Sequence, residues 1–270
     1  MTNDSPIKAV LVVILVALVT SSLVSATVVI LRPFQLNNQL LDRSRNILQL
    51  TGLTPARAAP SDAEVLALFK SLDARIVDID AAVFDSSIEP HGFDRHRAAR
   101  DQQFSVAIPP GLDRAALGRR STFAPAYLVW RDNEFERIIL PIRGNGMWSA
   151  LYGYIALESD LNTIAEATFY EQNETPGMGD QITRPDWLAR WRGRRIYDER
   201  GEIHFAVAVG KVDPGSLSAA FEVDALTGAT VTTDAVTELI HYWFGPHGYQ
   251  PFLANLRAQR PAKPMPTEDP

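Results

Sequence analysis

A run of 23 residues without a charged side chain, from Ala9 to Leu31, lies near the start of this 270-residue chain. At about 1.5 Å per residue, a helix of this length reaches roughly 35 Å, enough to cross a hydrocarbon core about 30 Å thick. A cleavable signal peptide is the alternative, with Lys8 as its basic start and Val24-Ser25-Ala26 as the cleavage site. Because the apolar run continues past that site, the pattern favours a retained membrane anchor.

The basic residues around this span leave its orientation open. Arg32, Arg43 and Arg45 follow the span and only Lys8 precedes it, which by the positive-inside rule would keep the rest of the chain in the cytoplasm. Long domains, however, translocate largely regardless of charge. The charge pattern alone therefore does not decide the side of the membrane.

The overall composition excludes several classes of protein. With 46% hydrophobic and 21% charged residues, the chain is neither wholly disordered nor collagen-like. A net charge of −6 without a basic block argues against a nucleic-acid partner, which would require a positive surface. The absence of cysteine excludes disulfides and thiolate metal sites, and the five histidines lack metal-motif spacing, so no metal site is expected.

These patterns divide the chain into five parts. They are a short tail at 1–8, the anchor at 9–31, a helix and hinge linker at 32–60, a soluble domain at 61–258 and a disordered tail at 259–270. A helix is expected over Leu36–Leu50, and the Ala- and Pro-rich residues 51–60 indicate a hinge. Ser61 and Glu64 have the spacing of a capping box at the start of the next helix.

The soluble domain is predicted to be α+β, with one mostly antiparallel sheet and flanking helices in about 200 residues. Five segments rich in β-branched and aromatic residues predict strands: Ala126–Trp130, Arg137–Pro141, Leu151–Leu157, Thr163–Glu171 and Ile203–Lys211. Two later helices are expected, one holding Trp187, Leu188 and Trp191, the other running from about Asp234 to Trp243.

The segment Asp224–Thr233, with the sequence DALTGATVTT, is the most informative about function. Local rules explain it as a turn in which one of the last two threonines caps the following helix. That explanation does not account for Gly228 and Ala229, whose minimal side chains leave the hydroxyl of Thr230 open to a bulky group. A helix N-terminus directly behind Thr230 would also favour a phosphate. The residues therefore leave a structural turn and an anion site as alternatives.

Asp224 and the tetrapeptide Thr227-Gly228-Ala229-Thr230 resemble the flavinylation motif Asp-x-x-Ser/Thr-Gly-Ala-Thr, whose last threonine carries FMN through a phosphoester. Nearly the whole chain resembles the NqrC family, which belongs to the sodium-translocating NADH:quinone reductases (Nqr). Three further segments carry this resemblance: Pro141–Ser149 (PIRGNGMWS), Leu151–Leu157 (LYGYIAL) and Tyr170–Gly179 (YEQNETPGMG). Thr227 stands where serine is usual and Met178 where leucine is usual, and neither change removes the acceptor hydroxyl.

The resemblance implies one FMN per chain, attached covalently to Thr230 by a separate FAD:protein FMN transferase that cleaves FAD. It implies an electron-transferring subunit of a membrane-bound, sodium-pumping NADH:ubiquinone oxidoreductase, with the NADH site and the sodium path in partner subunits. It also implies a domain on the periplasmic side of the bacterial inner membrane, which outweighs the arginine count. Thr230 is then an attachment point, and no residue of this chain is expected to be catalytic.

The resemblance further implies that Glu174, Thr175 and Gly177 lie beside the flavin, whereas the local pattern alone is that of a glycine-rich turn after a strand. Trp148 and Met147 are candidate apolar contacts of the flavin ring, although an aromatic residue after a Gly-x-Gly turn is also common in protein cores. These assignments are weaker than that of Thr230, because the motif does not specify them.

Alternatives remain for the function and for two local features. RnfG, the homologous flavoprotein of Rnf-type ferredoxin:NAD electron-transport complexes, shares the flavinylation motif, but the Gly-Met-Trp-Ser segment and the long region 50–125 favour the quinone reductase family. A non-redox, membrane-anchored assembly protein is a further alternative. Asp224 serves either transferase recognition or the turn. The basic segment Arg190–Arg195 indicates a solvated face or, alternatively, a docking surface for a partner or lipid headgroup.

Overall fold

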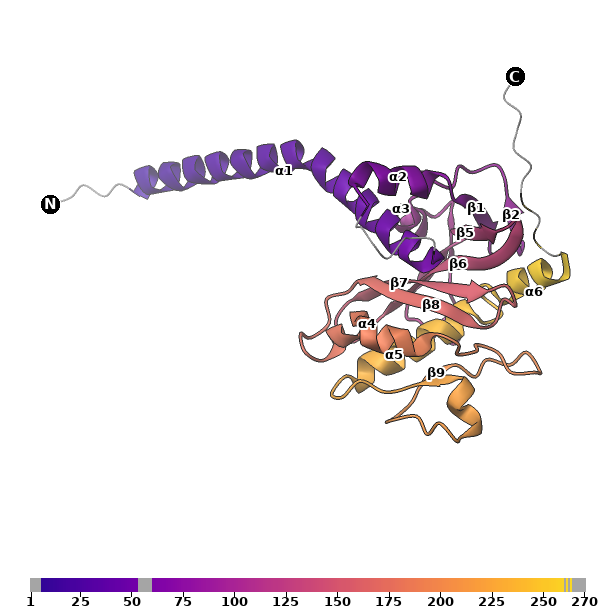
Figure 1. The fold of residues 1–270 in the computed structure, drawn as a ribbon. Coiled ribbons are helices and arrows are strands. Elements are labelled where there is room, and N and C mark those ends of the chain that lie inside the picture. The colour runs from indigo at the N-terminus through magenta and orange to yellow at the C-terminus, as the bar shows by residue number, and fades with distance from the viewer. Residues whose placement is uncertain (1–5, 53–59, 260, 262, 264–270) are drawn as a thin grey trace, which may run out of the picture. The chain divides into compact units, whose positions relative to one another are not determined.

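A computed structural model describes residues 6–52, 60–259, 261 and 263, which fall into two compact units divided between Arg45 and Asn46. The predicted N-terminal tail, the hinge and the C-terminal tail lie largely outside the described residues. The helices, shown in Figure 1, are α1 (Pro6–Thr51), α2 (Asp62–Lys70), α3 (Arg95–Arg100), α4 (Pro185–Leu188), α5 (Thr230–Trp243) and α6 (Gln250–Gln259), with 3₁₀ helices η1 (Gly179–Thr183), η2 (Ala189–Trp191) and η3 (Leu217–Ala220).

The strands form three sheets. They are β1 (Asp73–Asp78), β2 (Val83–Asp85), β3 (Ser105–Ala107), β4 (Arg119–Ser121), β5 (Phe123–Arg131), β6 (Glu134–Asn145), β7 (Ala150–Glu158), β8 (Ile164–Glu171), β9 (Ala206–Val207) and β10 (Glu222–Val223). The largest sheet has the order β2-β1-β5-β6-β7-β8, and every neighbouring pair in it is antiparallel. The predicted α+β class with a mostly antiparallel sheet is thus confirmed.

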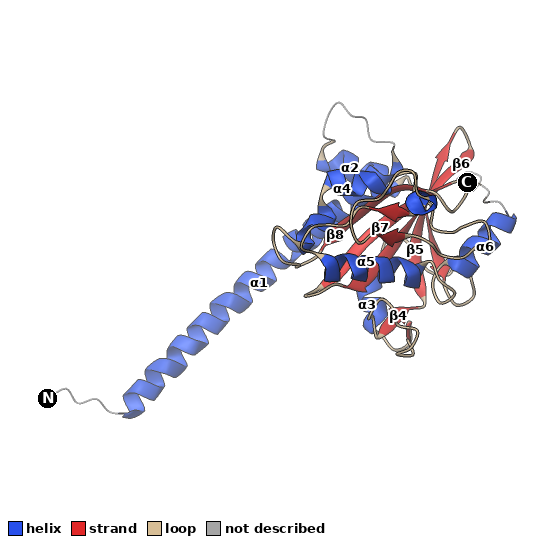
Figure 2. Ribbon diagram, turned by 90° about the horizontal axis from the view of Figure 1, so that it is seen from below, coloured by secondary structure: helices blue, strands red, loops and turns tan. Residues whose placement is uncertain are grey.

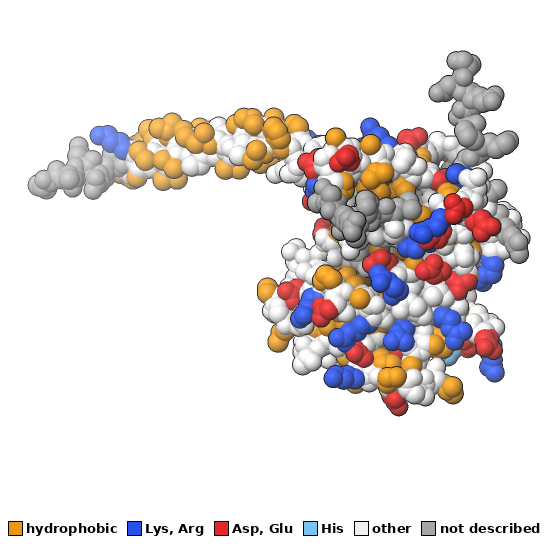
Figure 3. Space-filling view, viewed as in Figure 1, with side chains coloured by type: hydrophobic (Ala, Val, Ile, Leu, Met, Phe, Trp, Pro, Cys, Tyr) orange, Lys and Arg blue, Asp and Glu red, His pale blue; other side chains and the backbone are white. Residues whose placement is uncertain are grey.

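Among the described residues, α1 is the one helix long and apolar enough to cross a membrane. Large apolar side chains from Ile7 to Leu31 are exposed, and Figure 3 shows hydrophobic groups along most of this part of the helix. Such a surface is unfavourable in water at about 25 cal/mol per Å². The segments predicted as an anchor and a separate helix form one continuous helix that includes Pro33. Proline removes one backbone donor, and here the surrounding turns continue past it.

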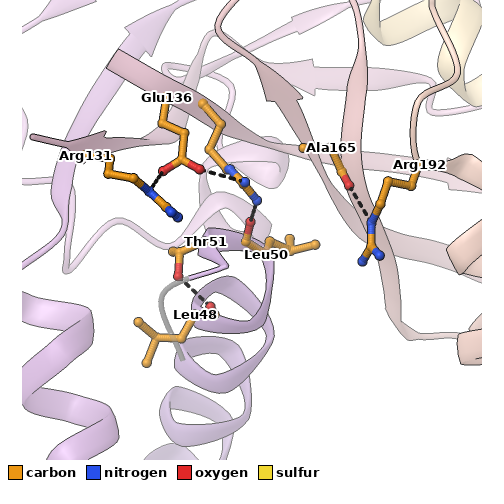
Figure 4. A network of polar contacts seen from close by, with 8 residues as sticks. Leu48, Leu50, Thr51, Arg131, Glu136, Ala165 and Arg192 are labelled. Atoms are coloured by element: carbon orange, nitrogen blue, oxygen red, sulfur yellow. Dashed lines mark hydrogen bonds and ion pairs between the residues drawn. The ribbon is translucent and has the colours of Figure 1, made fainter. Parts of the chain in front are cut away.

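The last residues of α1 belong to the second unit and are tied to strand β6 there (Figure 4). Arg137 donates one hydrogen bond to the carbonyl oxygen of Leu50 at 3.0 Å and another to the carboxylate of Glu136, also at 3.0 Å. Glu136 accepts a further bond from Arg131 at 2.9 Å. The guanidinium of Arg137 therefore satisfies a carbonyl at the end of a helix, where backbone acceptors lack intrahelical partners.

The sheet follows from its turn chemistry and its strand composition. Asp132 and Asn133 join β5 to β6 with φ angles of 52° and 64°, the geometry of a two-residue hairpin turn of type I′. Four of the five predicted strands lie within β5 to β8. The fifth prediction, Ile203–Lys211, is wrong, because only Ala206 and Val207 form a strand there. The amide of Val207 donates to the side chain of Thr237 at 3.0 Å, and a glycine at 210 soon ends the extended segment.

Helix α5 packs across one face of the sheet (Figure 2). A Cβ atom at Gly144 of β6 would lie 2.9 Å from Leu239 of α5, so this close packing requires glycine. The helix begins at Thr230, four residues before the predicted start at Asp234. The capping box of Ser61 at the start of α2, in contrast, is confirmed.

No side chain caps the N-terminus of α5, so the capping role predicted for Thr232 or Thr233 is wrong. Both residues lie inside the first turn. The hydroxyl of Thr233 donates to the carbonyl oxygen of Ala229 at 3.1 Å, a back-bond that lets a β-branched residue sit in the helix.

The helix predicted around Trp187 and Trp191 consists of α4 followed by η2. Both indoles are buried and pack edge to face, with ring centroids 5.4 Å apart. The indole nitrogen of Trp187 donates to the carbonyl oxygen of Asp224 at 2.8 Å. This bond holds the loop before α5 against the core.

Candidate functional site

The loop before α5 lines a cleft of about 500 Å³. Asp224, Thr227, Gly228 and Thr230, four of the five predicted motif positions, contribute to its wall. The fifth, Ala229, is buried behind them. Gly228 has a φ of +77°, a left-handed conformation that side chains rarely adopt and that turns the chain into the helix. The two hydroxyl-bearing residues of the motif, Thr227 and Thr230, therefore line the cleft.

Thr230 is the first residue of α5, and it is exposed. Its hydroxyl forms no hydrogen bond with the residues that the structure describes, unlike those of Thr232 and Thr233 in the same turn. Because the helix has no side-chain cap, its first backbone amides lack an internal acceptor, and its dipole is positive at this end. An anionic group linked to Thr230 would lie where the backbone favours negative charge.

Three cationic side chains face the same cleft from elsewhere in the chain: Arg184, Arg190 and Lys211. Arg184 pairs with Asp186 at 3.0 Å, and Arg190 pairs with Asp224. Within the described ranges Lys211 has no carboxylate partner. The cleft thus contains one positive charge not compensated by an ion pair.

Asp224 has structural partners on three sides. Its Oδ1 accepts a hydrogen bond from the amide of Val212 at 2.7 Å, its Oδ2 pairs with Arg190, and its carbonyl accepts the bond from Trp187. These contacts agree with the turn-holding role considered from the sequence. The recognition role at the transferase stays a prediction.

Glu174 is the most buried carboxylate near the motif, with an exposed fraction of 4%. It accepts hydrogen bonds from the amides of Met147, Trp148 and Ser149 at 3.1, 3.0 and 3.0 Å, all in the turn between β6 and β7. It also accepts a bond from the hydroxyl of Thr232 in α5 at 2.7 Å. Glu174 therefore links the β6–β7 turn to the first turn of α5.

The charged form of Glu174 is favoured by these bonds. Burial on its own raises the pKa of a carboxyl, but the hydroxyl of Thr232 and the three turn amides outweigh that effect, and the pKa of Glu174 lies below its ordinary value. This geometry assigns Glu174 to holding the turn, and no flavin contact is needed to explain its burial.

Two glycines lack the side-chain atoms that would otherwise overlap Glu174 and its partner Thr232. A Cβ at Gly146 would lie 2.7 Å from the Glu174 carboxylate, and a Cβ at Gly179 would lie 2.7 Å from the Thr232 hydroxyl and 2.8 Å from Cβ of Glu174. Contacts this short do not occur for real side chains, so both positions require glycine. The pattern of glycines in this region is thereby explained by packing around one carboxylate.

Several large apolar side chains are exposed around these elements. Trp148 is 68% exposed, and Met147, Met178 and Val231 are also open to solvent. Met178 lies against the motif, since its Cε is 3.7 Å from a Cβ built at Gly228. Exposed apolar side chains beside a cleft are candidates for contact with a ligand or partner.

Thr175 and Gly177, which were also predicted beside a flavin, are exposed residues of the turn before η1. The carbonyl of Thr175 accepts a bond from the amide of Met178 at 3.1 Å, and the carbonyl of Gly177 accepts one from the side chain of Gln181 at 2.6 Å. Gln181 lines the cleft. The turn therefore borders the cleft, while its own bonds are those of a glycine turn.

Sequence reasoning missed two groups of residues here. Thr232 was interpreted as a cap, although it bonds to Glu174, 58 positions away in the sequence. The cleft cations Arg184 and Lys211 carried no signal, because nothing local connects them to the motif. The remaining cluster of possible metal ligands, Asp198, Glu202 and His204, is explained by hydrogen bonds within a turn, where Asp198 accepts the amide of Glu202 at 2.9 Å.

The comparison with protein families matches the part of the chain just described. A model of the FMN-binding domain matches residues 146–245, which include Glu174, the cleft and α5. Residues 146–245 of the chain thus match the FMN-binding domain class.

Relatives along the full length narrow this class. The chain is 42% identical to the NqrC protein of the Na⁺-translocating NADH-quinone reductase of Pseudomonas aeruginosa, over 94% of this chain and 97% of that protein. It is 36% identical to the corresponding protein of Yersinia pestis, over 94% of each chain. The crystal structure of Shewanella oneidensis NqrC superposes with a TM-score of 0.73 at 30% identity, covering 82% of this chain and 98% of that one. The chain belongs to the NqrC family of the Na⁺-translocating NADH-quinone reductases.

Proposed function

We propose that this chain is an electron-transferring subunit of a sodium-pumping NADH:ubiquinone oxidoreductase and carries one FMN, esterified through its phosphate to Oγ1 of Thr230. The observation that carries the proposal is the exposed hydroxyl of Thr230, which has no hydrogen-bond partner among the described residues, at the N-terminus of α5. The surrounding residues suit the group. Helix amides and Lys211 favour the phosphate, and the exposed Met178 and Trp148 offer apolar surface to a flat ring.

The attachment step is a phosphoryl transfer without oxidation or reduction. Oγ1 of Thr230 attacks the flavin-side phosphorus of FAD, a new P–O bond forms, the pyrophosphate bond breaks, and AMP leaves as the hydroxyl proton is lost. A separate FAD:protein FMN transferase supplies the catalytic groups, since no carboxylate or histidine among the described residues forms a hydrogen bond with the Thr230 hydroxyl. The product differs from the bare chain by the mass of FMN less one water.

After attachment, the residues of this chain hold in place the turn and the loop that surround the flavin. When bound, the isoalloxazine supplies one- and two-electron transfer. Glu174 fixes the turn that presents Met147 and Trp148, and Asp224 keeps the loop of Thr230 against Trp187. The NADH site and the sodium path belong to partner subunits of the complex.

The proposed location is the bacterial inner membrane, with α1 as a retained single-pass anchor and the second unit on the periplasmic side. The support is the apolar length of α1 together with the family to which the chain belongs. A covalent bond suits a carrier in that compartment, because free FMN would be lost by diffusion.

Intact mass spectrometry of the full chain, purified from membranes of a host with an active transferase, tests the proposal. We expect one adduct of FMN less one water, flavin fluorescence that survives denaturation, and no signal-peptide cleavage. Thr230→Val, which keeps the shape and removes the hydroxyl, should abolish the adduct, whereas Thr230→Ser should retain it. A bare mass in wild type would favour the alternative of a non-redox assembly protein, and flavin retained by Thr230→Val would refute the site.

Purification of the assembled complex tests the remaining alternative. NADH should reduce the flavin, and ferredoxin should not. The reverse result would favour an Rnf-type function, against the family assignment.

A further inference from the structure

A second cavity lies near the C-terminal end of α5, away from the motif at its N-terminus. It has a volume of about 40 Å³ and is lined by residues of α3, β4, β5, β6 and β7 together with Trp243 and Tyr249. Four arginines line it, and none of its lining residues is acidic: Arg95, Arg119, Arg120 and Arg143. Such a concentration of one charge in a mostly apolar cavity needs an explanation, because buried charges are usually paired.

Two of these arginines have partners in the fold. Arg119 donates to the hydroxyl of Ser105 at 3.1 Å and to its carbonyl oxygen at 2.8 Å. Arg120 pairs with Asp80. These two guanidiniums are therefore accounted for by the structure itself.

The other two have none. Nη2 of Arg95 and Nε of Arg143 are buried and donate no hydrogen bond. Neither guanidinium forms a hydrogen bond or ion pair with any residue within the described ranges. A buried donor without an acceptor is unfavourable, and native structures contain few of them. Two in one cavity indicate that an acceptor is taken from outside the chain.

Aromatic rings hold both guanidiniums in place without neutralising them. The guanidinium carbon of Arg95 lies 5.8, 5.0 and 5.6 Å from the ring centroids of Tyr152, Tyr154 and Tyr170. That of Arg143 lies 5.4 Å from the same Tyr152 ring. Cation–π contact orients the two charges on one ring and leaves their N–H groups available. The pair is thus arranged before any ligand is bound.

His96, which also lines the cavity, has a pKa that is affected by the arginines around it. Burial, followed by the positive charge of Arg95 and with smaller contributions from Arg143 and Arg100, lowers the pKa of His96 to about 4, against the opposing effect of Asp94. His96 is therefore neutral at physiological pH and adds no further charge.

We infer that this cavity binds a small carboxylate or a comparable oxyanion, held by Arg95 and Arg143. The guanidinium fork matches the geometry of a carboxylate or nitrate, and desolvated pairs of this kind are strong. A single water needs about 10–15 Å³, so the cavity of about 40 Å³ has room for a ligand of about the size of formate, acetate or nitrate. This inference is independent of the proposed flavin site.

The test uses the full detergent-solubilised chain titrated with sodium acetate and with sodium nitrate. Ionic strength is held constant with a bulky sulfonate too large for the cavity. We expect saturable heat of binding, competition between acetate and nitrate, and a rise in the pKa of His96 measured by NMR, because a nearby anion favours the protonated ring. Arg95→Met and Arg143→Met should each weaken binding on the order of tenfold or more.

Arg100→Met is the matched control, since Arg100 is exposed at the end of the same helix and does not line the cavity. It should leave the affinity within about threefold. Should a methionine variant fail to fold, Arg143→Lys keeps the charge without the fork and should still weaken binding. An absence of saturable binding, equal affinity in all variants, or an unchanged pKa of His96 at saturating acetate would each overturn the inference.

Discussion

Two charged sites in the second unit, a buried carboxylate and a pair of partly buried guanidiniums, differ in how the fold treats them. Around Glu174, every neighbouring donor is directed at the carboxylate, from the β6–β7 turn on one side and from Thr232 on the other. Around Arg95 and Arg143, aromatic rings are present but acceptors are missing among the described residues. A buried charge that the protein satisfies completely holds the fold together. One that it leaves without an acceptor is the better candidate for a ligand.

The largest effect on stability is expected for Glu174→Gln. The amide replaces one acceptor oxygen by a donor and places it against backbone N–H groups, so the free energy of unfolding should fall by about 2–3 kcal/mol. Urea unfolding of the detergent-solubilised chain, followed by near-ultraviolet circular dichroism, measures this. Glu171→Gln, at an exposed position on the end of β8, should change stability by less than about 0.5 kcal/mol. Equal effects of the two variants would contradict the structural role of Glu174.

The same carboxylate predicts a pH dependence. Because the pKa of Glu174 is lower in the folded chain than its ordinary value of 4.5, its stabilisation is complete above pH 4.5 and decreases as the pH falls through the folded-state pKa. Wild type should therefore lose more stability than Glu174→Gln between pH 6 and pH 3, a range of about three units. Parallel stability profiles for the two proteins would show that Glu174 does not titrate in this way.

Gly179→Ala should have a somewhat smaller effect. The added methyl group would overlap Thr232 and Glu174, and such overpacking costs about 1–3 kcal/mol. The same urea titration measures it. Gly177→Ala is a poor control because of its positive φ, whereas Gly92→Ala adds its methyl group to open space and should be close to neutral. A neutral Gly179→Ala would mean that Glu174 has room to move.

Thr232→Val removes one hydrogen bond to Glu174 and should cost about 1 kcal/mol. Thr230→Val is its matched control in the same turn, since that hydroxyl has no hydrogen-bond partner among the described residues. The two variants should have opposite effects on stability and on flavin retention. Thr232→Val should weaken the fold and keep the flavin, as judged by fluorescence after denaturation. Thr230→Val should keep the fold and lose the flavin. If Thr232→Val lost the flavin without losing stability, the separate roles of the two threonines would be contradicted.

The smallest effect is expected at the arginine site. In the absence of added anion, Arg143→Met removes a partly buried charge whose Nε has no acceptor among the described residues, so its unfolding free energy should stay within about 1 kcal/mol of wild type or rise. Thermal and urea unfolding in anion-free buffer measure it. A loss comparable to that of Glu174→Gln would show that Arg143 is already satisfied, and the contrast between the two sites would disappear.

Features that depend on neighbours in the sequence were predictable. The capping box at Ser61 and strands β5 to β8 follow from local chemistry and alternation, and the structure confirms them. The motif at Thr230 identified the loop that lines the cleft, and its assignment to FMN stays a proposal. The segment Ile203–Lys211 shows the limit, because it pairs with the two-residue strand β10 only over Ala206 and Val207, and most of it is a loop.

Features that depend on distant pairing were not predictable. Glu174 meets Thr232 across 58 positions, and Arg95 meets the tyrosines of β7 and β8 only because the sheet folds under α3. The residues themselves gave no hint, since a glutamate in a glycine turn and an arginine on a short helix both look like surface positions. Burial, which only the tertiary structure supplies, separates them from the surface.

The glycines at 146 and 179 bear on how this family can diverge. A side chain added at either position would occupy space that Glu174 or Thr232 already fills, so neither glycine can be replaced without moving these two residues. Val231, whose side chain is exposed in the same region, carries no such packing constraint.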